Sequence, residues 1–202
     1  MALSAKVKIN RINNLSDARY TAGMGVEWAG FCLDPNDPEC LDRETYSAMT
    51  GWISGVKLVG EFGNCDYQNI AVRLAECPVD YVQTSNKETV NELKERDLKV
   101  IFEVEVSDKL ETTLREAKDN IAYFLINKSD AELHNSGLKD ILILSNQYPI
   151  ILGFGFDAVN VTSITRSHPI KGIALDGGKE IKPGIKDFDH LADIFDALEI
   201  ED

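Results

Sequence analysis

The chain has 202 residues, of which 34 are acidic and 21 are basic, so its formal net charge is −13. The basic residues are scattered, which argues against a nucleic-acid partner, and no apolar run approaches the roughly 20 residues that cross a bilayer. Because residues 1–8 lack the apolar segment of a secretory signal, we expect a cytoplasmic protein with no membrane partner. The composition, 44% hydrophobic and 27% charged, is typical of a folded protein, and we expect one domain over residues 1–202.

Eight short runs rich in β-branched and aromatic residues predict strands. In chain order they cover residues 7–9, 28–33, 56–62, 80–83, 99–104, 122–126, 149–154 and 171–175. Residues that favour helix starts follow each run, at Ser16–Asp17, Asp42–Glu44, Asp66, Asn86–Glu88, Ser107–Asp108, Ser129–Asp130, Asp157 and Asp187–Asp189. Strands apolar enough to be buried on both faces, alternating with helices, predict an α/β protein with a parallel sheet.

The alternation fits a closed eight-stranded (β/α)8 TIM barrel better than an open doubly wound sheet, which is the alternative. An open sheet of that kind normally has a glycine-rich turn after its first strand, whereas residues 9–14 contain no glycine. We therefore predict a compact barrel near the short end of the usual size range. Its active-site groups are expected at the carboxyl ends of the strands.

Cysteine and histidine give no sign of a metal or redox site. Their spacing matches neither a zinc motif nor a Cys-x-x-Cys pair. The residues are Cys32, Cys40, Cys65, Cys77, His134, His168 and His190. We interpret them as packing cysteines and surface histidines, and we expect no metal and no cofactor.

The carboxyl ends of the predicted strands carry a short set of polar side chains, among them Asn10, Arg11, Asp34, Glu61, Ser85, Glu103, Asn127 and Lys128. The last two strands are followed by glycines, at Gly155 and at Gly177 and Gly178. Glycines at this place commonly form the phosphate pocket of a barrel, although glycine is also the ordinary residue of a tight turn. Asp176 beside them would repel a phosphate unless its side chain caps a helix instead.

Several short motifs, in the same order along the chain, resemble the phosphoribosylanthranilate isomerase family. Residues 8–14, Lys-Ile-Asn-Arg-Ile-Asn-Asn, resemble that family's Lys-Ile-Cys-Gly-Ile-Thr-Asn opening. Residues 59–64 are similar to its Val-Gly-Val-Phe-Val-Asn strand, and residues 80–85 to its Asp-Val-Val-Gln-Leu-His. Residues 172–184 align without a gap to its Gly-Val-Asp-Val-Ser-Ser-Gly-Val-Glu-Ser-Ser-Pro-Gly. The resemblance implies a TIM barrel and an Amadori rearrangement of phosphoribosylanthranilate in tryptophan biosynthesis.

The departures from the family's motifs fall on its catalytic positions. The resemblance implies a general base, a cysteine, after the first strand and a general acid, an aspartate, after the sixth, but these positions hold Asn10 and Asn127. An amide does not exchange protons near neutral pH, so each change is expected to cost about 10²–10⁴-fold in rate. Glu39 also stands where the family has a loop arginine, and Ser85 where it has a histidine.

The resemblance therefore implies a divergent family member with a degenerate active site and lost or altered isomerase activity. The alternative is a non-catalytic barrel that binds a small ligand or a protein partner. We expect a small phosphorylated or polar ligand and a monomer or homodimer. An enzyme with altered chemistry would use Arg11, Asp34, Glu61, Glu103 or Lys128.

We further expect Asn10, Ser85 and Asn127 to line the mouth of the barrel together, because a parallel barrel brings all strand ends to one face. Two amides and a hydroxyl would form a neutral pocket suited to a neutral polar ligand.

Overall fold

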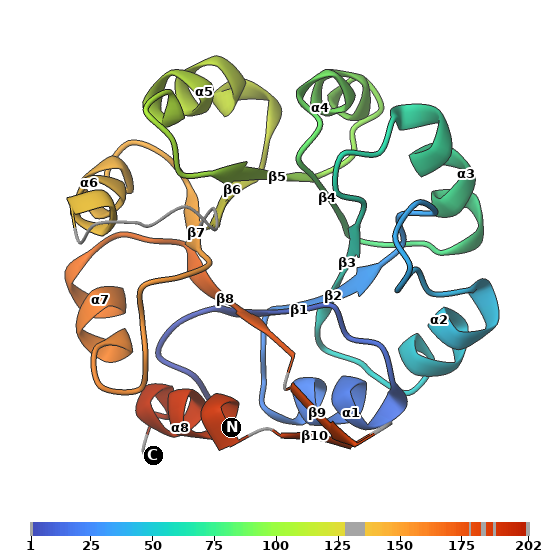
Figure 1. Ribbon diagram of the computed structural model, residues 1–202, viewed down its shortest axis with the longest axis horizontal. Coiled ribbons are helices and arrows are strands. Elements are labelled where there is room, and N and C mark those ends of the chain that lie inside the picture. The colour runs from blue at the N-terminus through green and yellow to red at the C-terminus, as the bar shows by residue number, and fades with distance from the viewer. Residues whose placement is uncertain (1, 128–135, 178, 183–184, 188, 201–202) are drawn as a thin grey trace.

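A computed structural model describes residues 2–127, 136–177, 179–182, 185–187 and 189–200. Eight parallel strands form a closed barrel in chain order, and helices surround it (Figure 1). The strands are β1 (Val7–Asn10), β2 (Trp28–Cys32), β3 (Lys57–Glu61), β4 (Tyr81–Thr84), β5 (Val100–Glu105), β6 (Tyr123–Asn127), β7 (Ile150–Leu152) and β8 (Gly172–Asp176). Pairing of β1 with β8, from Val7 opposite Ile173 to Asn10 opposite Asp176, closes the ring. The TIM barrel and all eight predicted strands are confirmed.

The helices are α1 (Leu15–Gly23), α2 (Arg43–Thr50), α3 (Tyr67–Glu76), α4 (Lys87–Lys94), α5 (Leu110–Ala117), α6 (Ser136–Leu144), α7 (Val161–Ser167) and α8 (Asp189–Leu198), with a 3-10 turn at Lys118–Asn120. The side chains of Asp42, Asp66 and Asn86 cap α2, α3 and α4 as predicted. Asn14, and not Ser16, caps α1. None of the described helices is both long and apolar enough to cross a membrane.

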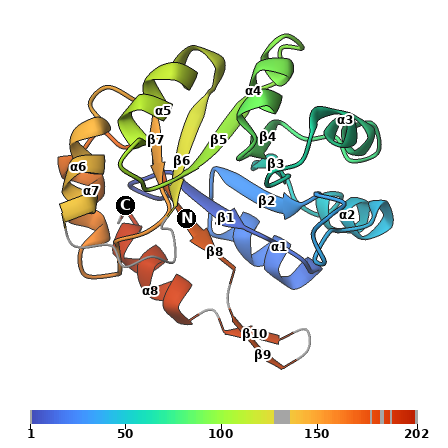
Figure 2. The ribbon, with the colours of Figure 1, turned by 45° about the horizontal axis from the view of Figure 1, so that its top comes forward.

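The predicted helix starts at Ser107–Asp108 and Asp157 lie just before α5 and α7, and the Asp157 carboxylate accepts the backbone N–H groups of Val159 and Asn160. Helices α5 and α7 begin after Lys109 and Asn160, whose side chains make no capping hydrogen bond. The predicted start at Ser129 lies outside the described residues. A short antiparallel hairpin, β9 (Lys179–Lys182) and β10 (Ile185–Asp187), was not predicted (Figure 2). It places Asp187 in a strand, while Asp189, the last residue of the same predicted helix start, begins α8. Both strands of the hairpin are mostly charged, with the sequences Lys-Glu-Ile-Lys and Ile-Lys-Asp, and so lack the apolar runs from which the other strands were predicted.

Two apolar clusters form the core, one between the strands and the helices and one inside the barrel. The inner cluster takes one side chain from each of seven strands, namely Trp28, Val59, Tyr81, Ile101, Leu125, Ile151 and Ala174. In β1, Val7 and Ile9 belong to the outer cluster, so the alternating direction of strand side chains points Lys8 and Asn10 inward. The barrel interior therefore contains a lysine where the other strands contribute apolar residues.

Lys8 is neutralised inside the barrel by Glu61. Its ammonium group forms an ion pair with Glu61 and also donates to Oδ1 of Asn10, and the Lys8 side chain is 0% exposed. Gly30 in β2 provides the space, because a Cβ there would overlap with Oε1 of Glu61 and lie 2.7 Å from Nζ of Lys8. A side chain at this position is therefore incompatible with the ion pair.

We predict that Lys8→Met lowers the free energy of unfolding by about 3–5 kcal/mol, because it leaves the buried Glu61 carboxylate without its counter-charge. The double variant Lys8→Met/Glu61→Gln should recover most of that loss, since it removes both charges. Chemical denaturation measures both effects.

The matched control is Lys87→Met, which breaks an ion pair with Glu116 whose side chains are 56% and 50% exposed. Its effect should stay within about 0.5 kcal/mol. Equal effects of Lys8→Met and Lys87→Met would contradict the structural role of the buried pair.

Candidate functional site

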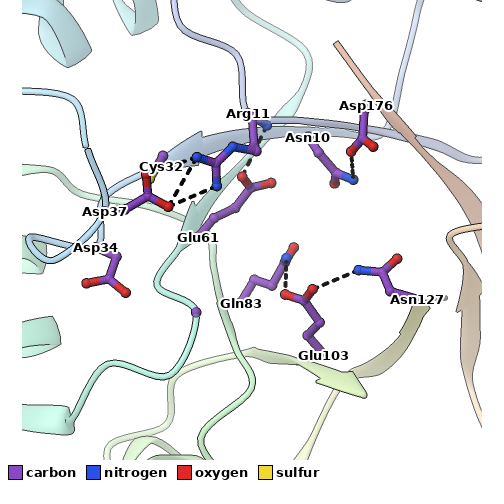
Figure 3. Close-up of a pocket in the computed structure, with 11 residues that line it drawn as sticks. Asn10, Arg11, Cys32, Asp34, Asp37, Glu61, Gln83, Glu103, Asn127 and Asp176 are labelled. Carbon is purple, nitrogen blue, oxygen red and sulfur yellow. Dashed lines mark hydrogen bonds and ion pairs between the residues drawn. The ribbon is translucent and has the colours of Figure 1, made fainter. Parts of the chain in front are cut away.

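A cavity of about 200 Å³ lies at the carboxyl ends of the barrel strands (Figure 3). It is lined by Asn10, Arg11, Cys32, Asp34, Asp37, Glu61, Gly63, Gln83, Glu103, Asn127 and Asp176. Most of these are the last inward-facing residue of a strand or the first residues of the loop after it. The cavity thus occupies the place where barrel active sites are found.

The structure brings many of the predicted site residues together. Seven of them line the cavity, namely Asn10, Arg11, Asp34, Glu61, Glu103, Asn127 and Asp176. Glu39 lies at the rim against Arg11, while Gly155 and Gly177 are not part of the lining. Lys128 and Gly178 lie outside the described residues.

Ser85 does not share the cavity with Asn10 and Asn127, contrary to our expectation. It is exposed just beyond β4, and its backbone N–H donates to the carbonyl of Gly63 at 2.8 Å. The last inward-facing residue of β4 is Gln83, so Gln83 occupies the place in the cavity that we expected Ser85 to fill.

Both asparagines are held by hydrogen bonds to carboxylates. Nδ2 of Asn10 donates to Asp176 at 3.0 Å, and Nδ2 of Asn127 donates to Glu103 at 2.7 Å. Gly153 leaves room for Asn127, because a Cβ on that glycine would overlap with the Asn127 amide oxygen. The orientation of both amides is therefore fixed by the folded chain.

Glu61 connects the barrel interior to the cavity. One of its oxygens pairs with Lys8, and the other accepts the backbone N–H of Arg11 at 3.1 Å. Arg11 has φ of 52°, in the left-handed region that non-glycine residues seldom adopt. This backbone conformation directs the Arg11 N–H toward Glu61 and leaves the guanidinium at the rim.

At the rim, the Arg11 guanidinium binds two carboxylates of the loop between β2 and α2. It donates to both oxygens of Asp37, with distances of 3.0–3.1 Å, and to Glu39 at 2.6 and 2.9 Å. The hydrogen bonds from Arg11 are the main reason that the pKa of Asp37 lies below its usual value. Hydrogen bonding to Asp37 likewise raises the pKa of Arg11.

Cys32 is the only cysteine in the cavity lining. Burial, reinforced by the nearby charge of Asp37, raises the pKa of its thiol to about 12. A thiol is nucleophilic only as the thiolate, so Cys32 is not an activated nucleophile. Within the described part of the chain, we also find no group of three or more His, Cys, Asp or Glu side chains that could hold a metal ion.

The expectation of a neutral pocket was wrong. Five carboxylates line the cavity, from Asp34, Asp37, Glu61, Glu103 and Asp176, against the single guanidinium of Arg11. The described lining residues thus have a formal net charge of −4, or −3 when Lys8, which is ion-paired with Glu61 beneath the cavity, is counted. The sequence analysis considered the two amides and the hydroxyl alone and left out the carboxylates from neighbouring strand ends, which lie on the same face of a parallel barrel.

The phosphate interpretation of the late glycines stays a prediction. Gly155 has φ of +80°, which explains a glycine there as turn chemistry. The N–H of Gly177 donates to the carbonyl of Asn10 at 3.3 Å, so it already has an acceptor.

Sequence reasoning missed Gln83, Cys32, Asp37 and Gly63 as lining residues. A signal for Gln83 and Cys32 was present, because each lies two residues after an inward-facing position, Tyr81 and Gly30. Successive inward positions are two residues apart in a strand. Asp37 lies in a loop and has no such periodic signal.

We predict that Asp37→Asn lowers stability by about 0.5–1 kcal/mol near neutral pH, because it weakens the rim pairing with Arg11. The folded-state pKa of Asp37 is lowered from 3.8, so this stabilisation is present above pH 3.8 and is lost as the pH falls through the folded-state value. Denaturation of both proteins across acidic pH tests this. A difference that persists unchanged at about pH 2.5 would argue against the pairing.

Comparison with known proteins agrees with this barrel. Residues 8–197 match the family described as N-(5'-phosphoribosyl)anthranilate (PRA) isomerase. The N-(5'-phosphoribosyl)anthranilate isomerase of Parabacteroides distasonis is 27% identical, over 92% of this chain and 89% of that protein. The isomerase of Nitrosomonas eutropha is 29% identical, over 93% of each chain.

Solved structures show the same fold. The crystal structure of phosphoribosyl anthranilate isomerase from Thermotoga maritima superposes with a TM-score of 0.78 at 24% identity, covering 96% of this chain and 98% of that one. A 2-keto-3-deoxy-6-phospho-gluconate aldolase from Zymomonas mobilis is also similar, with a TM-score of 0.64 at 13% identity over 96% of this chain and 90% of that one. The barrel alone is therefore compatible with more than one chemistry. Because the family match spans nearly the whole chain, this protein belongs to the N-(5'-phosphoribosyl)anthranilate isomerase family.

Proposed function

We propose that this protein keeps the isomerase barrel as one domain over residues 1–202 but does not catalyse the isomerisation at a useful rate, and that its cavity binds a small polar ligand. The observation that carries the proposal is the pair of amides, Asn10 and Asn127, at the positions that the family resemblance assigns to the general base and the general acid. Neither side chain releases or accepts a proton near neutral pH.

The hydrogen bonds of the two asparagines support this reading. Each amide nitrogen donates to a carboxylate, Asp176 or Glu103, so each side chain is held as a fixed donor. Replacing a proton-transfer pair by two fixed amides is expected to lower the rate of the isomerisation about 10²–10⁴-fold per group. Such groups can still bind and orient a ligand.

The charge of the cavity also opposes the family's substrate. One solved relative, 24% identical, was crystallised with reduced 1-(O-carboxyphenylamino)-1-deoxyribulose 5-phosphate, a compound that carries a carboxylate and a phosphate. A lining with five carboxylates and one guanidinium repels such an anion. Asp176 and Glu39 add negative charge at positions where the resemblance implies a serine and an arginine.

An enzyme with altered chemistry is a second candidate, favoured by the convergence of Arg11, Glu61 and Glu103 on one cavity. The hydrogen bonds of Glu61 and Glu103 argue against a catalytic role. Both oxygens of Glu61 accept from Lys8 and Arg11, and both oxygens of Glu103 accept from Gln83 and Asn127. Carboxylates held in this way are suited to binding a ligand, so a binding function remains our proposal.

We predict no more than trace turnover of phosphoribosylanthranilate by the purified protein, because Asn10 and Asn127 do not transfer protons. A steady-state assay, run beside the Thermotoga maritima isomerase as a positive control, measures it. Turnover within about tenfold of the control, or growth of a tryptophan auxotroph carrying the unmodified gene, would reject the proposal.

The double variant Asn10→Cys/Asn127→Asp should gain weak activity at best. Glu39 and Asp176 would remain in this variant, and their negative charge would still oppose the anionic substrate. Recovery of the control's full rate in the same assay would show that the surrounding charges do not oppose the substrate.

A further inference from the structure

The cavity lining is rich in carboxylate oxygens, which accept hydrogen bonds and carry negative charge. Its three side-chain amides, from Asn10, Gln83 and Asn127, each donate to a carboxylate of the lining. The Arg11 guanidinium donates to Asp37 and Glu39 at the rim. Each amide nitrogen keeps a second N–H, so the lining offers donors as well as acceptors, but the described lining residues carry a formal net charge of −4.

Gln83 supplies a second, independent sign of a ligand. The residue is only 6% exposed, and its Nε2 donates to Oε2 of Glu103 at 2.8 Å. This bond fixes the amide, because turning it around would place its oxygen against the carboxylate. Its buried oxygen, Oε1, then has no hydrogen-bond partner among the described residues.

Figure 3 shows the Gln83 amide with its nitrogen directed toward Glu103 and its oxygen directed away from it, into the cavity. A buried acceptor without a partner is unfavourable, and a ligand N–H that reaches it removes that cost. The ligand group that binds here must therefore be a hydrogen-bond donor.

The carboxylates of the cavity lining are already held in place. Glu103 accepts from Gln83 and Asn127, Asp176 accepts from Asn10, and Glu61 accepts from Lys8. A carboxylate has about four lone-pair sites, so each keeps acceptor capacity for a ligand. Acceptors fixed before binding lose little conformational entropy when a ligand arrives.

Taken with the proposed function, on which this inference rests, these contacts indicate the class of ligand. We propose that the cavity binds the guanidinium or ammonium group of a small organic cation, with its N–H groups donating to Gln83 Oε1 and to carboxylates of the lining such as Glu103. A volume of about 200 Å³ holds roughly seven waters at about 30 Å³ each, which suits a small molecule. The lining thus selects a cation, whereas the solved relative described above was crystallised with an anion.

Methylguanidinium and methylurea test the proposal, because they have nearly the same shape and differ in charge and in donors. Titration calorimetry and backbone amide shifts should show methylguanidinium binding at least about tenfold more tightly than methylurea, and less tightly as salt is raised. The affected amides should be those of the cavity lining. Equal binding of the two probes, or binding of neither, would overturn the proposal.

Single variants test whether Glu103 and Gln83 form the proposed binding site. Glu103→Gln removes one charge, and Gln83→Met removes the unpaired acceptor without changing charge; each should weaken methylguanidinium binding about tenfold. Glu105→Gln is the matched control, because it makes the same change at the end of the same strand on an exposed side chain outside the lining. Weakening by Glu105→Gln equal to that by Glu103→Gln would indicate a general charge effect and contradict the proposed site.

Two further probes complete the test. Inorganic phosphate that binds at the lining more tightly than methylguanidinium, or a Ca²⁺ ion that displaces it, would replace the proposal with an anion site or a metal site. The outcome is separable from the proposed function, since isomerase turnover is measured independently. Methylguanidinium binding without turnover supports both, whereas absent turnover with no probe binding overturns only this inference.

Discussion

A charge inside the barrel is the constraint on which the rest of the site depends. Seven strands fill the interior with apolar side chains, but β1 contributes Lys8, which is fully buried. An unpaired buried charge is strongly destabilising, so Glu61 must lie beside it and Gly30 must lack a side chain. Glu61 in turn positions the first loop through the backbone of Arg11. The polar layer above the core is thus ordered from Lys8 outward.

The sequence was sufficient for the barrel, because its signals are local and repeated. All eight strands were found as apolar runs, and Asp42 and Asp66 were found as helix caps from their residue type and place. The site was harder to predict. Which side chains share a cavity depends on the direction each takes at its strand end, and Gln83 faces inward where Ser85, two positions later, is exposed in a loop.

The acidity of the cavity was missed for a related reason. Asp34, Glu61 and Glu103 were each identified at strand ends, but their effect is collective and appears only when the ring is closed. Comparing one position at a time with a family motif therefore underestimates the negative charge of the cavity. Charges that would be solvated on separate loops act together in a small, partly desolvated space.

Arg11 holds a strained backbone conformation at the rim of the cavity. Its left-handed backbone is the conformation for which the family's opening motif, with glycine at this position, is suited, and a non-glycine residue loses about 1–2 kcal/mol there. Its side chain offsets that strain by joining the first loop to Asp37 and Glu39 in the next. Two loops that would otherwise fluctuate independently are tied into one unit. Replacing Arg11 by glycine would relax the backbone and at the same time free both loops, so backbone strain and rigidity of the cavity mouth are opposed at this one residue.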